Sequence, residues 1–342
     1  MRGLGAGRHP ENSRRCNDRG RRKHGNGDRT VSLAIGLSLP QLGEHVDAGA
    51  VRAFATSAEE LGFSSLWVQE HLFYPEQNES IYGGRHTTSV HPAYRSVLGA
   101  TELMAFTAAC TRTVTIGSSI LVAGYHRPVE LAQRLSTLDL LSGGRLVAGL
   151  GAGWSDEEHA QMDVDPRTRG RRMGELVRAV QACWGPDPVE FEGEFFTIPR
   201  SIVRPKPVQQ PHPPLLSGLR SATGLKRTAA LFDIWNPSSG SPEALLEQLE
   251  TMRGLRPEGA HPVRLFLRSY LQRPTDAVGS GGQGIDGVRG DIRTALAAGA
   301  EHLIVEPNFW DAMRSPNDWV DAPAQLAVLL DDVEELSTAS AS

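Results

Sequence analysis

The stretch RPVELAQRLSTLDLLSGGRLVAGLGAGW, residues 127–154, contains the pattern that decides the fold. Its first part has helical spacing, with Pro128 in the first turn and Gly143 and Gly144 at the end, which is typical of a helix start and stop. Its second part, RLVAGLGAG, has the continuous apolar character of a buried strand. The stretch therefore predicts a helix that leads directly into a strand.

The same alternation continues on both sides of this stretch. Strands are expected over 31–39, 63–68 and 113–123, with helices over 47–62 and 95–111 between them. The later elements are expected in this order: helix 167–184, two short strands within 188–198, strand 215–217, helix 221–231, strand 232–235, helix 242–253, strand 263–271, helix 287–298, strand 302–307 and a last helix near 323–336. Eight strand-helix units over about 310 residues favour an α/β fold, a (β/α)8 TIM barrel with insertions.

The main alternative fold is a doubly wound open sheet that binds a dinucleotide. Only GLGAGW could support it, and there Gly149, Gly151 and Gly153 alternate. The dinucleotide fingerprint instead needs its third glycine three residues after the second. The residues that follow, Ser155 and Glu158, have the spacing of a capping box and predict the start of another helix.

Charge divides the chain into two parts. Residues 1–30 hold nine Lys or Arg against three Asp or Glu, which leaves the other 312 residues with a formal net charge of −11 within the total of −5. The first part has almost no large apolar residue, so we expect a disordered basic extension over 1–30 and a single domain over 31–338. The acidic domain argues against nucleic-acid binding.

The spacing of the cysteines and the length of the apolar runs indicate where in the cell the protein is expected. Cys16, Cys110 and Cys183 are far apart and form no CxxC pair, so neither a disulfide framework nor a zinc site is expected. No apolar run reaches the eighteen or so residues of a membrane span. A twin-arginine export signal is also not expected, because VSLAIGLSL, the apolar run after the arginine pairs, has only nine residues and no typical cleavage site. We therefore expect a cytoplasmic protein.

A barrel predicts chemistry at the carboxyl ends of its strands. The second strand ends in LWVQEHLFYP, which places Glu70 and His71 at that position. His71 is the candidate catalytic residue because an ordinary imidazole gains and loses a proton near neutral pH. Adjacent residues of an extended chain face opposite ways, so Glu70 is expected to be a neighbour of the site rather than part of one unit with His71. The spacing of His71, His86 and His91 does not suggest a metal site.

The loop from Leu72 to Tyr94 is long, polar and aromatic, and it has Gly83 and Gly84 as a possible hinge. A loop of this length inside a compact domain is usually functional or disordered. We therefore expect a substrate lid. Candidate substrate contacts are Glu70, Tyr74, Tyr125 and Trp154.

Three further loops reach the same end of the predicted barrel. GSSILVAGYHRP follows the third strand, GAGW lets the backbone approach a ligand after the fourth, and LLSGLRSATG joins the fifth strand to a helix start. In the last of these, Arg220 and the hydroxyls of Ser221 and Thr223 could hold a phosphate together with backbone N–H groups.

Several of these segments, in this order and spacing, resemble the bacterial luciferase-like monooxygenase family. They are LGFSSLWVQEH, TVTIGSSILVAGYHRPVELAQRLSTLDLLSGGRLVAGLGAGWSDEE, FEGEFFTI, PKPVQQPHPP and FDIWNP. The resemblance covers residues 31 to about 310, and LSGGRLVAGLGAGW is its most specific segment. Within the family, the chain is most similar to oxidoreductases that use the 5-deazaflavin coenzyme F420.

The resemblance implies a (β/α)8 barrel with the cofactor at its carboxyl-end mouth. By motif, His71 matches the histidine beside the deazaflavin ring, and Ser119 with Ile120 matches the bulged position, often a non-proline cis peptide, behind that ring. Gly151, Ala152 and Gly153 match the turn after the fourth strand, and the segment from Gly218 through Arg220 and Ser221 to Thr223 matches the loop at the cofactor phosphate.

The chain also departs from the family pattern. Trp154 stands where the sugar-phosphate dehydrogenases of the family have a catalytic glutamate, and Leu219 and Ile234 stand where glycines are usual. The expected function is hydride transfer between F420 and a small organic substrate. Two alternatives remain: a monooxygenase that uses reduced FMN, and a non-catalytic flavin-binding or partner-binding barrel. A homodimer is possible because such pairing is common in the family.

Overall fold

The computed structural model describes residues 33–76, 80–82, 85–86, 91–238, 240–276 and 280–339. The basic extension over 1–30 and the possible hinge at Gly83 and Gly84 lie outside the described residues. Residues 77–79 and 87–90 of the predicted lid also lie outside the described residues.

Eight parallel strands close into a barrel. They are β1 (Ala34–Ser38), β2 (Ser65–Val68), β5 (Thr115–Ser118), β7 (Leu146–Gly151), β10 (Leu215–Ser217), β11 (Ile234–Trp235), β12 (Arg264–Tyr270) and β13 (His302–Glu306). Each pairs with the next in this order, and β13 pairs with β1, with Ala34 opposite His302, to close the ring. The predicted (β/α)8 barrel is confirmed.

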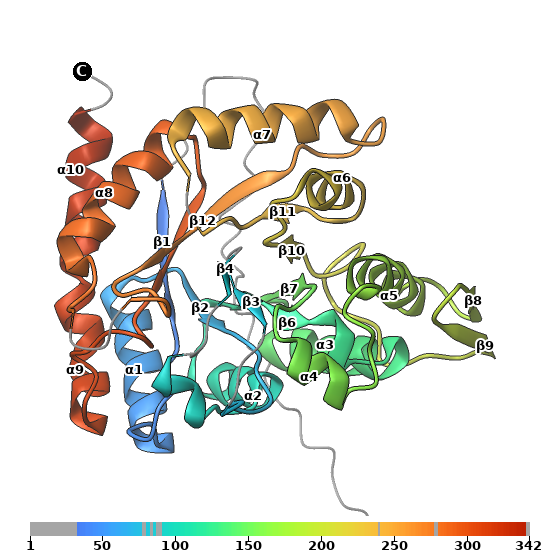
Figure 1. The fold of residues 1–342 in the computed structure, drawn as a ribbon, viewed down its shortest axis with the longest axis horizontal. Helices are drawn as coiled ribbons and strands as arrows, with labels where there is room; N and C mark the ends of the chain where they lie inside the picture. Colours follow the sequence, from blue (N-terminus) through green and yellow to red (C-terminus); the bar gives the residue numbers. More distant parts are fainter. Residues whose placement is uncertain are drawn as a thin grey trace, which may run out of the picture. The chain divides into compact units, whose positions relative to one another are not determined.

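Helices surround these strands on the outside (Figure 1). They are α1 (Ala48–Leu61), α2 (Ala100–Cys110), α3 (Pro128–Ser142), α5 (Arg169–Trp184), α6 (Ala222–Leu231), α7 (Pro242–Leu255), α8 (Gly284–Ala297), α9 (Pro316–Leu326) and α10 (Val328–Ala339). The start and stop signals act locally, as at α1, where Asp47 accepts a hydrogen bond from the N–H of Ala50 and Gly62 ends the helix at φ 98°.

Insertions interrupt the repeat at several positions. A short strand β6 (Leu121–Val122) continues the third strand and pairs with β7, and the short helix α4 (Asp156–Gln161) follows β7. Two antiparallel pairs, β3 (Ile81–Tyr82) with β4 (Arg85–His86) and β8 (Val189–Glu192) with β9 (Thr197–Ser201), stand outside the barrel. Short 3-10 helices lie at Pro92–Arg95 and Ala123–Tyr125.

The expectation of one last helix near 323–336 was wrong. Two helices, α9 and α10, occupy this part of the chain. The first begins earlier because Ser315 accepts a hydrogen bond from the N–H of Asp318 and Pro316 stands in the first turn. Pro323 lies inside α9 rather than at a helix start.

The ring of Trp67 is fully buried inside the barrel, where it belongs to a cluster of apolar side chains. A Cβ added at Gly117 would lie 2.2 Å from this ring, so only glycine leaves room for it. The indole Nε1 donates to the hydroxyl of Ser65 over 2.6 Å, and that hydroxyl lies 2.6 Å from Nε2 of His302. Burial lowers the pKa of His302 to about 4, which keeps the ring neutral near pH 7.

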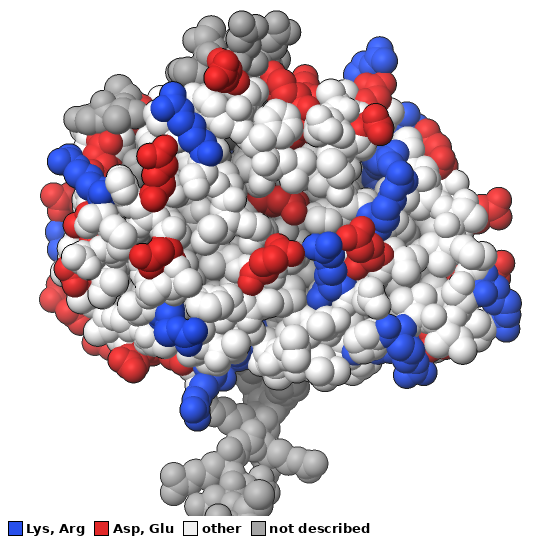
Figure 2. Space-filling model, turned by 90° about the horizontal axis from the view of Figure 1, so that it is seen from below, with Lys and Arg blue, Asp and Glu red and all other residues white. Residues whose placement is uncertain are grey.

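Acidic and basic side chains are interspersed over the face seen in Figure 2, without a continuous area of one sign. This face lacks the basic stripe that a nucleic-acid groove presents. Within the described residues, no helix is both long and apolar enough to cross a membrane.

Candidate active site

His71 follows β2 at the carboxyl end of the barrel, and its partner is Glu158 of α4. The Nδ1 atom of His71 lies 3.3 Å from Oε2 of Glu158, with both side chains almost fully buried. A titratable imidazole therefore stands at the predicted position. Its partner is Glu158, from the short helix after β7, rather than its sequence neighbour Glu70.

The two oxygens of the Glu158 carboxylate have different donors. Oε1 accepts from the backbone N–H groups of Leu72 and Phe73, over 2.6 and 3.3 Å. Oε2 accepts from the hydroxyl of Tyr125 over 2.6 Å and faces His71. Burial alone would raise the pKa of Glu158, but the hydrogen bonds from His71, Tyr125 and Leu72 outweigh it and hold the pKa below its ordinary value. Glu158 is thus a buried carboxylate that stays charged.

Tyr125, a predicted substrate contact, is buried with its hydroxyl directed to Glu158. Burial, reinforced by the charge of Glu158 and the hydrogen bond to it, raises the pKa of Tyr125 far above its ordinary value. The phenol therefore keeps its proton and acts as a donor to the carboxylate.

Glu70 holds a different histidine. Its carboxylate lies 3.0 Å from Nε2 of His126 and accepts from the N–H of Val122 over 2.6 Å. Its own N–H donates to the carbonyl of Ile120. Glu70 therefore fastens the chain after β5 to the end of β2, and this placement agrees with the separation of Glu70 from His71 that the alternation of side chains predicted.

Aromatic rings enclose the imidazole of His71. The ring of Tyr94 lies 4.4 Å from it between centroids, and the ring of Trp154 lies 5.6 Å from it. Tyr94 in turn contacts Phe309, which follows β13. Tyr74 packs against the same cluster, with the guanidinium of Arg95 over its ring. The site therefore has an apolar, flat-walled surround.

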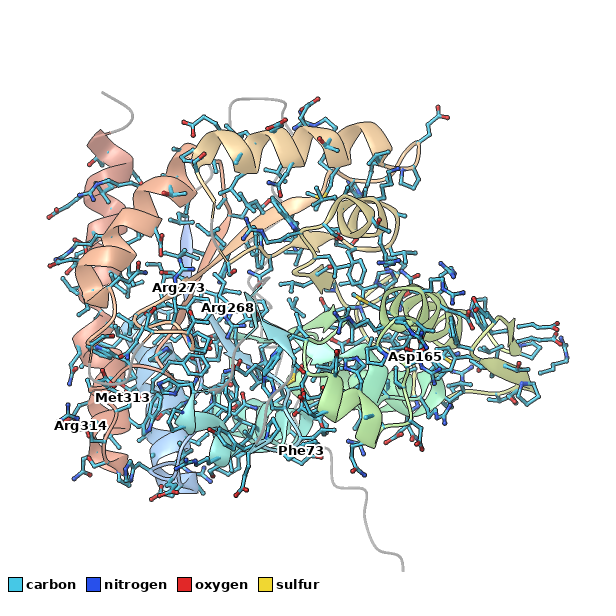
Figure 3. All side chains as sticks on the ribbon, in the orientation of Figure 1. Phe73, Asp165, Arg268, Arg273, Met313 and Arg314 are labelled. Carbon is cyan, nitrogen blue, oxygen red and sulfur yellow. The ribbon has the colours of Figure 1, made fainter. Side chains whose placement is uncertain are left out.

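Ser119 and Ile120 are joined by a cis peptide bond, as the family resemblance implied. The hydroxyl of Ser119 donates to Oδ1 of Asn236 over 2.7 Å and accepts from Nη1 of Arg268 over 2.9 Å. Arg268 also bonds the carbonyl of Ser119 and forms an ion pair with the fully buried Glu306. Figure 3 shows Arg268 among the barrel strands, so this bulge rests on a buried polar layer inside the barrel.

The glycines at the end of β7 and just after it are needed for packing within the chain. A Cβ at Gly151 would lie 2.4 Å from Ile120, and a Cβ at Gly153, which has φ 75°, would lie 2.6 Å from both His159 and Val122. The carbonyl of Ala152 faces Nε2 of His159 at 2.9 Å. The turn therefore brings the backbone of residues 151–153 against the bulge at Ile120.

The predicted phosphate loop lies after β10. Gly218, Arg220, Ser221 and Thr223 are all exposed there, at the start of α6. The hydroxyl of Ser221 caps the helix by accepting from the N–H of Gly224 over 3.0 Å. Leu219, which stands where the family usually has a glycine, is held by its backbone, because its carbonyl accepts a hydrogen bond from Nε1 of Trp235.

The loop after β2 is tied to α4 at a second point. The hydroxyl of Ser80 bonds the carboxylate of Glu157 and accepts from the N–H of Asp156 over 2.7 Å. Leu72, Phe73 and Ser80 are therefore all attached to the same short helix.

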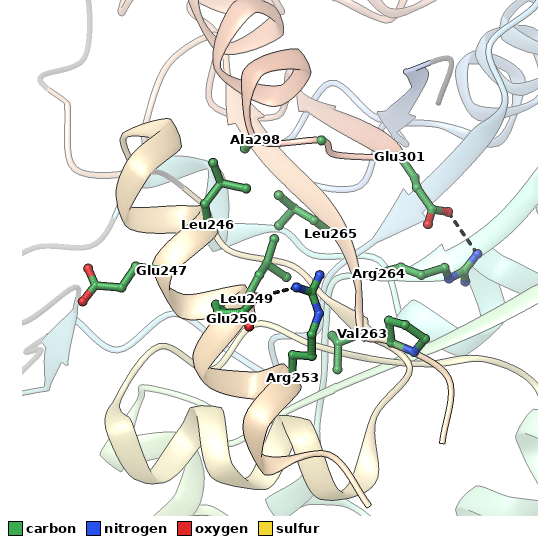
Figure 4. A pocket seen from close by; sticks show the side chains of 12 residues that line it. Leu246, Glu247, Leu249, Glu250, Arg253, Val263, Arg264, Leu265, Ala298 and Glu301 are labelled. Atoms are coloured by element: carbon green, nitrogen blue, oxygen red, sulfur yellow. Dashed lines mark hydrogen bonds and ion pairs between the residues drawn. The ribbon is translucent and has the colours of Figure 1, made fainter. Parts of the chain in front are cut away.

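A hollow of about 620 Å³ lies at the opposite end of the barrel (Figure 4). It is lined by α7 and by the beginning of β12, including Leu246, Leu249 and Val263. Four of its charged side chains form two ion pairs, Arg253 with Glu250 and Arg264 with Glu301. Barrel enzymes place their chemistry at the carboxyl ends of the strands, so this hollow is not the candidate site.

Sequence reasoning missed the residues that support the site from other elements. Glu158 was recognised only as part of a capping box. Ser155 does cap α4, accepting from the N–H of Glu158 over 3.2 Å, but the carboxylate of Glu158 turns to His71 and Tyr125. Its position on the buried face of a helix, where an ionised acid needs partners, was the available signal. The buried acids and cations of β12 and β13 carried no comparable local pattern.

Comparisons with known proteins agree with this architecture. Residues 31–271 match the model of the luciferase-like monooxygenase family. An F420-dependent glucose-6-phosphate dehydrogenase of Kineococcus radiotolerans is 32% identical over 187 residues, which cover 54% of this chain and 51% of the dehydrogenase. An FMNH(2)-dependent dimethylsulfone monooxygenase of Pseudomonas putida is 26% identical over 166 residues, covering 48% of this chain and 46% of the monooxygenase. A crystal structure of a long-chain alkane monooxygenase shares the fold, with a TM-score of 0.66 and 14% identity over 88% of this chain and 91% of the other.

Proposed function

Because the chain belongs to the luciferase-like monooxygenase family, we propose that it is an oxidoreductase that transfers a hydride between coenzyme F420 and a small organic substrate. The substrate bond is an activated C=C, C=N or C=O that is reduced, or its saturated counterpart that is oxidised. The observation that carries this proposal is the imidazole of His71 held by the buried carboxylate of Glu158. Hydride transfer to or from such a bond is accompanied by a proton, and His71 is the group that can carry it.

The residues present fit the cofactor. Arg220 supplies a cation, Thr223 a hydroxyl and the start of α6 its backbone N–H groups, which together suit a phosphate. A Cβ at Gly218 would lie 3.2 Å from the carbonyl of Asn236, so glycine lets this loop lie close to the barrel end. The bulge at Ser119 and Ile120 would support the ring. When bound, the deazaflavin supplies a ring carbon that gives or takes hydride and reacts poorly with oxygen.

The protein contributes position, a proton and exclusion of water. His71 holds or releases the proton at Nε2, the ring nitrogen that does not face Glu158. The aromatic rings of Tyr94 and Trp154 limit solvent around it. The predicted lid, residues 72–94, is the part of the chain that would cover a substrate, and its described residues Leu72, Phe73 and Ser80 bond to α4.

The proposal is tested by fluorescence titration of the purified protein with oxidised and reduced F420 and with FMN. Tight binding of F420, with weak binding of FMN, is the expected result. A candidate substrate panel of enones, imines and ketones with reduced F420 then measures loss of the reduced cofactor. Tight binding of FMN, no binding of F420 and oxygen consumption with reduced FMN would refute the proposal.

That opposite outcome would identify a flavin monooxygenase, which the similarity to the FMNH(2)-dependent enzyme makes the second candidate. In that case the aromatic rings around His71 would serve to exclude water from the bound flavin. Failure to bind either cofactor would instead favour a non-catalytic, partner-binding barrel.

A further inference from the structure

We propose that Glu158 is a positioning residue that sets the tautomer of His71, with the proton on Nδ1 and a free lone pair on Nε2. The use of this lone pair in catalysis rests on the proposed function, but the tautomer itself does not. The inference follows from how the donors divide between the two carboxylate oxygens.

A carboxylate only accepts hydrogen bonds. Because the carboxylate of Glu158 stays charged, the Nδ1 atom that faces its Oε2 must carry the proton of a neutral imidazole. The other ring nitrogen, Nε2, is then the acceptor. A His71 fixed in this form is ready to take a proton at Nε2 without first exchanging its tautomer.

The charges around this pair reinforce the assignment. The hydroxyl of Tyr125 stays protonated and donates a hydrogen bond to the same oxygen. The charge of Glu70 raises the pKa of Tyr125 and the charge of Arg169 lowers it. The carboxylate of Glu70 is paired with His126 and accepts a hydrogen bond from the N–H of Val122. Arg169 is itself paired with Asp156. Among the described residues, Glu158 is therefore the acid that faces His71.

The same division predicts what an isosteric substitution does. In Glu158→Gln the amide oxygen should take the place of Oε1, because two backbone N–H groups donate there. The amide NH₂ then takes the place of Oε2 and donates to Nδ1 of His71. The proton of the neutral imidazole must move to Nε2, so this one substitution should invert the tautomer with little change of shape.

The experiment is NMR of the full chain labelled with ¹⁵N-histidine, at about pH 9, where ordinary imidazoles are neutral. His71→Asn identifies the His71 signals by their loss. The wild type should show a protonated Nδ1 and a bare Nε2, and Glu158→Gln should show the reverse. A wild-type ring with its proton on Nε2, or an equal mixture of tautomers, would overturn the proposal without any use of a variant.

Two controls separate orientation from general damage. Glu70→Gln also removes a histidine-paired carboxylate at this end of the barrel and should leave the His71 tautomer unchanged. Tyr125→Phe removes a donor from Oε2 but leaves the carboxylate, so Nδ1 should stay protonated. A change of the His71 tautomer in Glu70→Gln would mean that the ring responds to the surroundings as a whole, against the proposal.

Turnover provides a second readout. If the proposed function holds, Glu158→Gln should lower turnover by about 10²-fold and change its pH profile, while F420 affinity stays within about threefold. A correct tautomer with no F420 activity would refute the proposed function and leave the positioning role intact. An unchanged pH profile in an active Glu158→Gln enzyme would refute the role of Glu158 in catalysis.

Discussion

The imidazole of His302 stacks on the ring of Phe266, with ring centroids 4.7 Å apart, inside the barrel. Its Nε2 lies 2.6 Å from the hydroxyl of Ser65. A charged imidazole would be desolvated there, and burial accordingly lowers the pKa of His302 to about 4. His302 is therefore a structural histidine of the core, unlike His71, and it affects stability rather than chemistry.

This burial predicts acid sensitivity. Because the folded-state pKa of His302 is below the unfolded value of about 6.5, the unfolded chain binds more protons between these values. The free energy of unfolding should be unaffected above pH 6.5 and should fall by about 3 kcal/mol by pH 4. Urea unfolding of wild type and His302→Asn between pH 7 and pH 4 checks this. If the free energy of unfolding changes equally with pH in the two proteins, the prediction is wrong.

Glu59 predicts a second, lower pH window. Its carboxylate accepts from the backbone N–H groups of Arg112, Thr113 and Val114. Burial opposes ionisation, but these hydrogen bonds outweigh it and lower the pKa of Glu59 to about 2. Its contribution should be complete above pH 4.5 and be lost as the pH falls through about 2. Solvent screening limits it to about 1 kcal/mol.

The check for Glu59 is acid unfolding followed by circular dichroism, with Glu59→Gln as the variant. The variant should be less stable at pH 6 and should approach the wild type at pH 2. Glu60, the exposed neighbour of Glu59, provides the control, since Glu60→Gln should change stability little at either pH. A loss in Glu59→Gln that persists unchanged at pH 2 would argue against this account.

Gly117 should not tolerate alanine. The added Cβ would lie 2.2 Å from the buried ring of Trp67, which cannot move within the barrel, so Gly117→Ala should cost about 1–3 kcal/mol. Gly290 is the matched control, because it lies within α8 and a Cβ there meets nothing within 4 Å. Gly290→Ala should stabilise the protein by about 0.5–1 kcal/mol. Thermal unfolding of both variants measures the difference, and effects of the same sign would be inconsistent with it.

His71→Ala should lower F420-linked turnover by about 10²-fold or more, because the proton would lose its carrier. Binding of F420, measured by fluorescence, should be nearly unchanged. His45, an exposed histidine after β1, provides a control whose replacement by alanine should leave turnover unaffected. Full activity of His71→Ala would instead support a non-catalytic barrel or a different proton carrier.

The barrel could be predicted because its signals are local. Strand and helix periods, Asp47 and Gly62 at the ends of α1 and the glycines after α3 are all visible within a few residues of sequence. His71 could be found for the same reason, since it lies three residues after β2. Its partner could not, because Glu158 is 87 positions away and comes close only when the barrel closes.

The buried polar residues behind the bulge also could not be predicted from a local sequence pattern. Arg268 and Glu306 lie within apolar strands and become partners only through the pairing of β12 with β13. The resemblance to a family supplied the cis peptide at Ser119 and Ile120, which no periodicity indicates. The roles assigned to the glycines after β7 and to the loop after β10 stay predictions.

The bonds of Leu72 and Phe73 to Glu158 come from their backbone N–H groups, while the two residues are 44% and 37% exposed. Every residue except proline has such an N–H. The side chains at these two positions can therefore vary in size and polarity while the anchor to α4 is preserved. Under the proposed function, substitutions at these two positions can change the edge of the substrate site, by evolution or by engineering, and leave the backbone hydrogen bonds to Glu158 in place.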